Sequence, residues 1–76
     1  MEKAYILLSC NIGQENELAV LLKTFPEIKE VTITYGEYDI VIKAETETSQ
    51  KMDELITSKI RKLEKIRSTI TLRVTC

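Results

Sequence analysis

The chain has 76 residues, of which 11 are basic and 12 acidic, and a formal net charge of −1. This length allows one domain with a small core, and such domains usually gain support from disulfides, a metal or a partner chain. Proteins that neutralise phosphates carry a clear basic excess, so neither DNA nor RNA is expected as a direct partner. No apolar run reaches the roughly 18 residues of a membrane span, and no membrane association is expected.

Cysteines and metals offer little support to the core. The sequence has two cysteines, Cys10 and Cys76, and no histidine. No signal-peptide pattern follows Met1, so we expect a cytoplasmic protein with reduced thiols, in which Cys10 is a small buried apolar residue. Two distant cysteines do not make a zinc site and no EF-hand spacing occurs, although an all-oxygen calcium or magnesium site stays open. We expect no metal or cofactor, which leaves self-association as the support.

The first part of the chain predicts a strand and a helix. Residues 3–10 are a nearly continuous apolar run, typical of a strand that is buried on both faces at the centre of a sheet. Residues 14–24 predict a helix that stops before Pro26, with glutamates near its N-terminus where they complement the helix dipole. The apolar stripe of this helix consists of Leu18, Leu21, Leu22 and Phe25.

The middle of the chain predicts a β-hairpin. Residues 28–35 alternate between apolar and polar side chains, and residues 38–44 are rich in β-branched side chains. Gly36 and Glu37 lie between the two runs, and a glycine in such a short connection predicts a tight turn.

The last part of the chain completes the fold. Residues 49–62 predict a second helix with Thr48 or Ser49 as N-cap, and residues 66–75 predict the final strand. The βαββαβ order with right-handed crossovers predicts an α+β, ferredoxin-like domain. It would have a four-stranded antiparallel sheet with both helices on one face and the first and third strands in the middle.

The sheet face opposite the helices has no segment left to cover it. In the last strand we expect Ile70 and Leu72 to share one face and Thr69 and Thr71 to share the other, uncovered one. The members predicted for the uncovered face are Thr32, Thr34, Val41, Lys43, Thr69 and Thr71, with Leu7 or its neighbours. A half-apolar, threonine-rich β face beside a small core is expected to bind another subunit.

The segment 59–67 concentrates basic side chains near the end of the second predicted helix. Cations at that place complement the negative end of the helix dipole, which is the structural interpretation. A weak anion-binding or nucleic-acid patch is the alternative, and the sequence leaves both open.

Catalysis is not expected. Without histidine, Ser–His, Cys–His and His–metal mechanisms are closed. Glu37 and Asp39 are the closest candidate carboxylate pair, roughly 6–7 Å apart if they lie on one strand face. Nothing else in the sequence supports hydrolysis, so we expect no enzyme, including none of the dimeric ferredoxin-like type.

The segment from Thr34 to Asp39 carries the most specific chemistry. Gly36 can adopt positive φ and expose backbone N–H groups to a carboxylate, while Asp39 can hold an ammonium group. Tyr35 and Tyr38 could then wall the side chain of a bound amino acid. The alternative is a purely structural hairpin, in which Gly36 turns the chain and Asp39 caps it.

Three segments of the chain resemble the RAM domain, the C-terminal effector-binding domain of the Lrp/AsnC family of transcriptional regulators. They are residues 25–31, 35–42 and 66–74, and the run Gly36-Glu37-Tyr38-Asp39 between two strands is the most specific part. The resemblance implies sheet-to-sheet dimers of the dimeric α/β-barrel type, which assemble further, commonly into octamers. It also implies an amino-acid effector between dimers. The implied effector-binding residues are Thr34, Tyr35, Gly36, Glu37, Tyr38, Asp39, Thr69 and Thr71.

The chain departs from the family in two respects. A strand begins almost at Met1, so we expect a stand-alone RAM domain over residues 1–76 with no helix-turn-helix domain and no direct DNA binding. Lys65 stands where a glycine is typical of the family before the last strand. Such a module would sense an amino acid or related metabolite and modulate full-length Lrp/AsnC regulators. A structural hetero-oligomerisation partner without a ligand and an ACT-like amino-acid-binding domain stay open.

Overall fold

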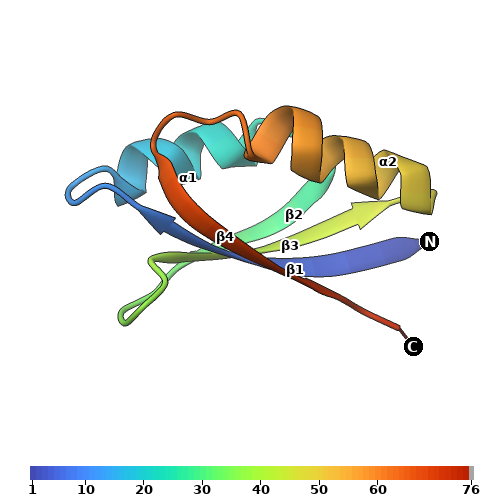
Figure 1. Ribbon diagram of the computed structural model, residues 1–76, viewed down its shortest axis with the longest axis horizontal. Coiled ribbons are helices and arrows are strands. Elements are labelled where there is room, and N and C mark those ends of the chain that lie inside the picture. The colour runs from blue at the N-terminus through green and yellow to red at the C-terminus, as the bar shows by residue number, and fades with distance from the viewer. Residues whose placement is uncertain (76) are drawn as a thin grey trace.

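The computed structural model describes residues 1–75, so the expectation of a reduced Cys76 lies outside the described residues. The elements are β1 (Glu2–Cys10), α1 (Glu15–Lys23), β2 (Ile28–Ile33), β3 (Ile40–Thr46), α2 (Ser49–Glu54), η1 (Leu55–Ile60) and β4 (Ile66–Arg73). The four strands pair antiparallel in the order β2-β3-β1-β4. Figure 1 shows α1 and α2 on the same side of this sheet. The ferredoxin-like fold and the central position of β1 and β3 are confirmed.

The core lies between the helices and one face of the two central strands. In β1, Ala4, Ile6 and Leu8 are fully buried, and Ile6 and Leu8 pair with Ile42 and Ile40 of β3. The apolar stripes of the two helices close this layer from above; their fully buried or nearly buried members are Leu18, Leu22, Met52, Leu55 and Ile60. The stripe predicted for the first helix therefore points to the core, apart from Leu21, which is exposed.

The prediction that the first strand is buried on both faces is wrong for this chain. The residues between the buried ones of β1 are exposed or half-buried, because they lie on the sheet face away from the helices. Tyr5 is 41% exposed and Leu7 is half-buried. The apolar run has no alternation because both faces of β1 are apolar, although the helices cover only one.

The predicted orientation of β4 is also wrong. In the register with β1, Thr69 lies opposite Leu8 and Thr71 opposite Ile6, so these threonines lie on the helix side of the sheet. Ile70 and Leu72 are on the opposite face and are 42% and 53% exposed. The helices cover an edge strand only partly. The helix side of β4 can therefore carry half-buried threonines where apolar residues were expected.

The uncovered face is consequently more apolar than predicted. One row across the sheet joins Thr32, Val41, Leu7 and Ile70, and the next joins Glu30, Lys43, Tyr5 and Leu72. Five apolar side chains thus meet on what we call the open face: Tyr5, Leu7, Val41, Ile70 and Leu72. Thr32, Val41, Lys43 and Leu7 were placed on this face correctly.

The second helix begins as predicted and then changes from α-helical to π-helical geometry. Thr48 is its N-cap, and Thr48 Oγ1 accepts a hydrogen bond from Lys51 N at 3.1 Å. From Leu55 to Ile60 the segment η1 has π-helical geometry, closed by Arg61 N donating to Ile56 O at 3.0 Å. Within the described residues, neither helix combines the length and the hydrophobicity needed to cross a membrane.

Candidate functional site

The hairpin between β2 and β3 is longer than predicted. The strands end at Ile33 and resume at Ile40, so residues 34–39 form the connection. Two hydrogen bonds close it: Thr34 N donates to Asp39 O, and Thr34 Oγ1 donates to Tyr38 O, both at 2.8 Å. Gly36 has a φ of +125°, which side-chain-bearing residues rarely adopt. The glycine is therefore required by the loop, as the sequence indicated.

Asp39 anchors this loop to the central strand. Its Oδ2 accepts a hydrogen bond from Cys10 N at 2.9 Å, and its own N–H donates to Leu8 O at 2.8 Å. These bonds match the structural interpretation, in which the aspartate caps the hairpin. They also hold the carboxylate in place, so that a ligand approaching this loop would meet a fixed negative charge.

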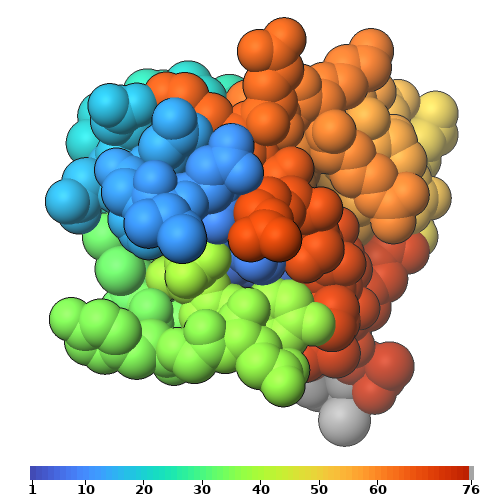
Figure 2. All heavy atoms as spheres, turned by 60° about the vertical axis from the view of Figure 1, so that its left-hand side comes forward, coloured from blue at the N-terminus to red at the C-terminus, as the bar shows by residue number. Residues whose placement is uncertain are grey.

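The hairpin borders a hollow of about 520 Å³. Four of the predicted effector-binding residues line it, namely Thr34, Tyr35, Gly36 and Asp39, together with Ile33 of β2 and with Glu15 and Asn16 of α1. Figure 2 shows the connection between β1 and α1 (blue) above the hairpin (green). Sequence analysis missed Glu15 and Asn16, because only the crossover after β1 brings the start of α1 to the hairpin.

The other predicted site residues lie elsewhere. Glu37 is exposed and Tyr38 half-buried in the loop, but neither lines the hollow. Thr69 and Thr71 are on β4, at the edge of the sheet opposite to β2, about three strand spacings or roughly 14 Å away. Thr71 Oγ1 is buried and has no hydrogen-bond partner among residues 1–75. One copy of the domain does not bring these threonines to the hairpin.

The electrostatics of the hollow are acidic. Burial raises the pKa of the Cys10 thiol, and the negative charges of Asp39 and Glu15 raise it further. Cys10 is therefore a neutral, buried thiol near pH 7 and not an activated nucleophile. The hollow is lined by two carboxylates and no basic residue, an arrangement that suits recognition of an ammonium group. Within residues 1–75, no group of three or more metal-ligating side chains gathers.

The basic segment 59–67 is partly engaged in ion pairs. Lys59 pairs with Glu27 at 3.0 Å, and Lys65 pairs with Glu17 and lowers the pKa of that glutamate by a hydrogen bond. Arg61, Lys62 and Arg67 are exposed. The pairing of Lys59 and Lys65 favours the structural interpretation for these two lysines.

Comparisons with known proteins agree with this geometry. The sequence matches the family model described as the Lrp/AsnC ligand binding domain over residues 3–75. The HTH-type transcriptional regulator FL11 of Pyrococcus furiosus is 38% identical over 53 residues, which are 70% of this chain and 35% of the regulator. The chain thus corresponds to about a third of the length of that curated relative.

Solved structures show the same fold. A hypothetical protein from Pyrococcus horikoshii is 41% identical with a TM-score of 0.95, covering 100% of this chain and 92% of that chain. A transcriptional regulator from Neisseria meningitidis, solved as an L-Met complex, shares the fold at 16% identity with a TM-score of 0.87, covering 99% of this chain and 50% of that chain. With the family match over residues 3–75, these likenesses show that the chain belongs to the Lrp/AsnC ligand-binding domain family of transcriptional regulators.

Proposed function

We propose that this chain is a ligand-sensing and oligomerisation module that binds a small amino acid or a related metabolite at a junction between dimers. The observation that carries the proposal is the hairpin hollow, because four residues of the segment from Thr34 to Asp39 line it. The L-Met complex of the Neisseria meningitidis regulator, which shares the fold, supports an amino acid as the ligand class. In the cytoplasm the module would modulate full-length Lrp/AsnC regulators without direct contact to nucleic acid.

The open face supports dimerisation. Tyr5, Ile70 and Leu72 are each at least 41% exposed, and they lie in adjacent rows across β1 and β4. Contiguous exposed apolar side chains of this kind mark an interaction surface. Two copies related by a two-fold axis can each use the same face, so one surface is sufficient to form a dimer.

The distribution of the predicted site residues supports a ligand at a junction between copies. Thr69 and Thr71 lie across the sheet from the hairpin of their own chain. They can contact the same ligand as Tyr35 only if another copy places its β4 beside this hairpin. Binding at such a junction would couple ligand occupancy to assembly, up to the octamer, through linkage.

Isothermal titration with each of the twenty amino acids, combined with sedimentation velocity, tests the proposal. At least one amino acid is expected to release or absorb heat and to change the sedimentation coefficient. Tyr35→Ala should weaken binding, because Tyr35 lines the hollow and is fully exposed. Lys62→Ala, at an exposed position that lines no part of it, serves as the matched control.

The absence of heat and of any sedimentation change with all twenty amino acids would refute the effector claim. The bonds of Asp39 to Cys10 and Leu8 would then favour the second candidate function, a structural oligomerisation partner without a ligand. Co-purification of a full-length regulator with the chain, unaffected by added amino acids, is the result expected for that candidate.

A further inference from the structure

A second and larger hollow lies at the opposite end of the sheet from the hairpin. Its volume is about 750 Å³, within the range of small-molecule sites. It is bordered by the connection from α1 to β2, the end of β3 and the second helix, with Pro26 and Leu55 as apolar lining. Because β3 extends over Ile40–Thr46, the two hollows are about 20 Å apart. A ligand in one does not touch the other.

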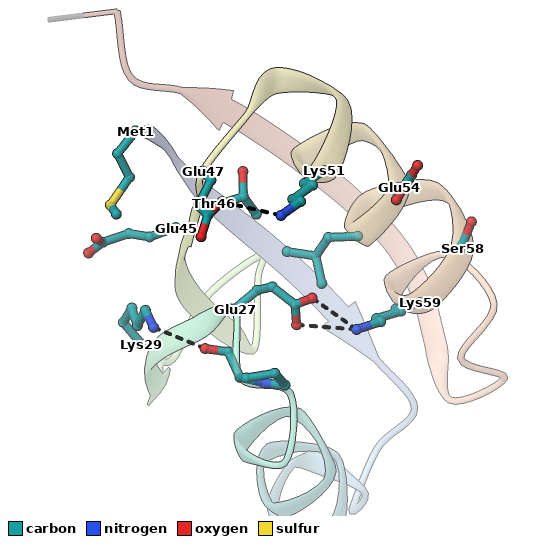
Figure 3. A pocket seen from close by; sticks show the side chains of 12 residues that line it. Met1, Glu27, Lys29, Glu45, Thr46, Glu47, Lys51, Glu54, Ser58 and Lys59 are labelled. Atoms are coloured by element: carbon teal, nitrogen blue, oxygen red, sulfur yellow. Dashed lines mark hydrogen bonds and ion pairs between the residues drawn. The ribbon is translucent and has the colours of Figure 1, made fainter.

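The hollow is surrounded by charges of both signs. Figure 3 shows Lys51 paired with Glu47 on one side and Lys29 on another. Lys51 Nζ is 3.3 Å from Glu47 Oε2. Lys29 Nζ donates to the carbonyl oxygen of Pro26 at 3.0 Å, so this ammonium group is bound to a neutral acceptor. It keeps its charge available to an anionic group of a ligand.

The ion pair between Glu27 and Lys59 forms the third side. Lys59 Nζ lies 3.2 and 3.0 Å from the two carboxylate oxygens of Glu27, and the two residues are 32 positions apart in the chain. The same ammonium lies 5.6 Å from the centre of the Phe25 ring. The hydrogen bond from Lys59 lowers the pKa of Glu27. The Glu27 carboxylate therefore stays ionised at neutral pH, and it lines the hollow together with Lys59.

The π-helical segment η1 supplies part of this wall. Leu55, Ser58 and Lys59 all belong to it and line the hollow. π-helical segments are rare in proteins, and they frequently occur at functional sites. In this chain the π-helical segment carries the residue that closes the ion pair with Glu27.

We infer that this hollow is a second binding site, for a small zwitterion of the size of a free amino acid or a dipeptide. The carboxylates of Glu27, Glu45 and Glu47 are each paired with a lysine, so the rim offers charges of both signs side by side. A ligand with only one charge would be attracted by one member of such a pair and repelled by the other. A zwitterion can match both members, with its carboxylate toward the lysines, its ammonium toward the glutamates and its apolar part over Pro26.

Titration of the ¹⁵N-labelled protein by two-dimensional NMR tests this inference. L-leucine and glycyl-leucine serve as zwitterionic probes, and N-acetyl-leucine and leucinamide carry only one charge each. At least one zwitterion should produce saturable shifts of the Glu27, Leu55 and Lys59 amide signals, and the singly charged probes should not. The L-leucine and glycyl-leucine titrations separate an amino-acid site from a dipeptide site.

Variants of single lysines test whether the charges at this hollow contribute to ligand binding. Lys29→Gln removes one charge at the hollow and leaves the pair of Glu27 and Lys59 intact, so it should weaken binding about threefold to tenfold without changing the fold. Lys62→Gln, at an exposed position outside the hollow, should leave the affinity unchanged. Tyr35→Ala should also leave this affinity unchanged, because that residue lines the hairpin hollow.

The inference is independent of the proposed function, so the experiment can refute either one without refuting the other. Shifts confined to Tyr35, Gly36 and Asp39 would support the hairpin site and overturn the second one. An absence of saturable shifts around Glu27 and Lys59 with either zwitterion, or equal affinity in the Lys29→Gln protein, would overturn it as well.

Discussion

Asp39 shows how one side chain fixes the position of the hairpin. Its carboxylate accepts the Cys10 N–H at 2.9 Å, a bond with one charged partner. Asp39→Ala is expected to lower the free energy of unfolding by about 1–2 kcal/mol, because the Cys10 N–H loses its acceptor. Asp39→Asn should cost less, since the amide oxygen can still accept. Urea denaturation of the three proteins measures both values.

The neighbouring Glu37 provides the comparison for Asp39. Glu37 is exposed in the same loop, so Glu37→Ala should change the free energy of unfolding by less than about 0.5 kcal/mol. Equal costs for Glu37→Ala and Asp39→Ala would show that the bond to Cys10 does not stabilise the fold.

Glu27 gives the fold a dependence on acid pH. The hydrogen bond from Lys59 lowers its pKa in the folded protein below the ordinary value of 4.5. The resulting stabilisation is complete above the unfolded-state pKa and is lost as the pH falls through the folded-state pKa. Lys59 is 42% exposed, so screening limits the effect, and Glu27→Gln should cost about 0.5–1 kcal/mol near pH 7. As the pH falls well below the ordinary value of 4.5, the cost should shrink toward zero.

Denaturation of the wild-type and Glu27→Gln proteins across this pH range measures that difference. Glu64→Gln is a suitable control, because Glu64 is exposed and forms no ion pair among residues 1–75. A cost for Glu27→Gln that is the same at both ends of the pH range would contradict the prediction.

Part of the lining of the hairpin hollow could be predicted, because four of its residues are neighbours in the sequence. Thr34, Tyr35, Gly36 and Asp39 belong to one loop, and a glycine between two strands indicates where that loop turns. The pair of Glu27 and Lys59 could not be predicted in this way, since 32 positions separate its members. This contact forms only because the second helix packs against the connection after α1. No local sequence pattern predicts such a contact.

At the scale of the elements, the N-cap of the second helix can be tested directly. The sequence allowed Thr48 or Ser49, and the structure assigns Thr48, whose Oγ1 accepts from Lys51 N at 3.1 Å. Thr48→Ala should therefore lower the free energy of unfolding by about 1 kcal/mol. Ser49→Ala, one position later and exposed, should change it by less than about 0.5 kcal/mol. Thermal and urea denaturation check both values, and a larger effect for Ser49→Ala would mean that the cap is misassigned.

Periodicity located every element but did not assign the faces of the sheet. In β4 both alternating sets are plausible core residues, and the more apolar set, Ile70 and Leu72, lies on the open face. The usual rule that the apolar set faces the helices fails here because the open face is itself apolar. The hydrophobic pattern also does not predict the π-helical turn, because Leu55 and Ile60 are buried whether that turn is α or π.

At the scale of the whole molecule, a sheet with two apolar faces has helices for only one of them. The helix side buries Ile6, Leu8, Ile40 and Ile42 completely, whereas Tyr5 and Leu72 stay largely exposed on the open face. A domain of this length has a small core and gains most from a partner that covers such a surface. The proposed dimer therefore links folding to association, which has a measurable thermodynamic consequence.

The midpoint of thermal unfolding should rise with protein concentration, by about 3–5 °C for each tenfold increase, because mass action stabilises a folded dimer. Leu72→Arg places a charge in the middle of the open face and should give a monomer whose midpoint is lower and independent of concentration. Val20→Arg adds the same charge at a position of α1 that is 66% exposed and remote from the open face, so its midpoint should keep the wild-type concentration dependence. Differential scanning calorimetry and sedimentation equilibrium measure both properties. A wild-type midpoint that does not change with concentration, in a protein that sediments as a fully folded monomer, would contradict pairing through this face and leave the junction between dimers without a structural basis.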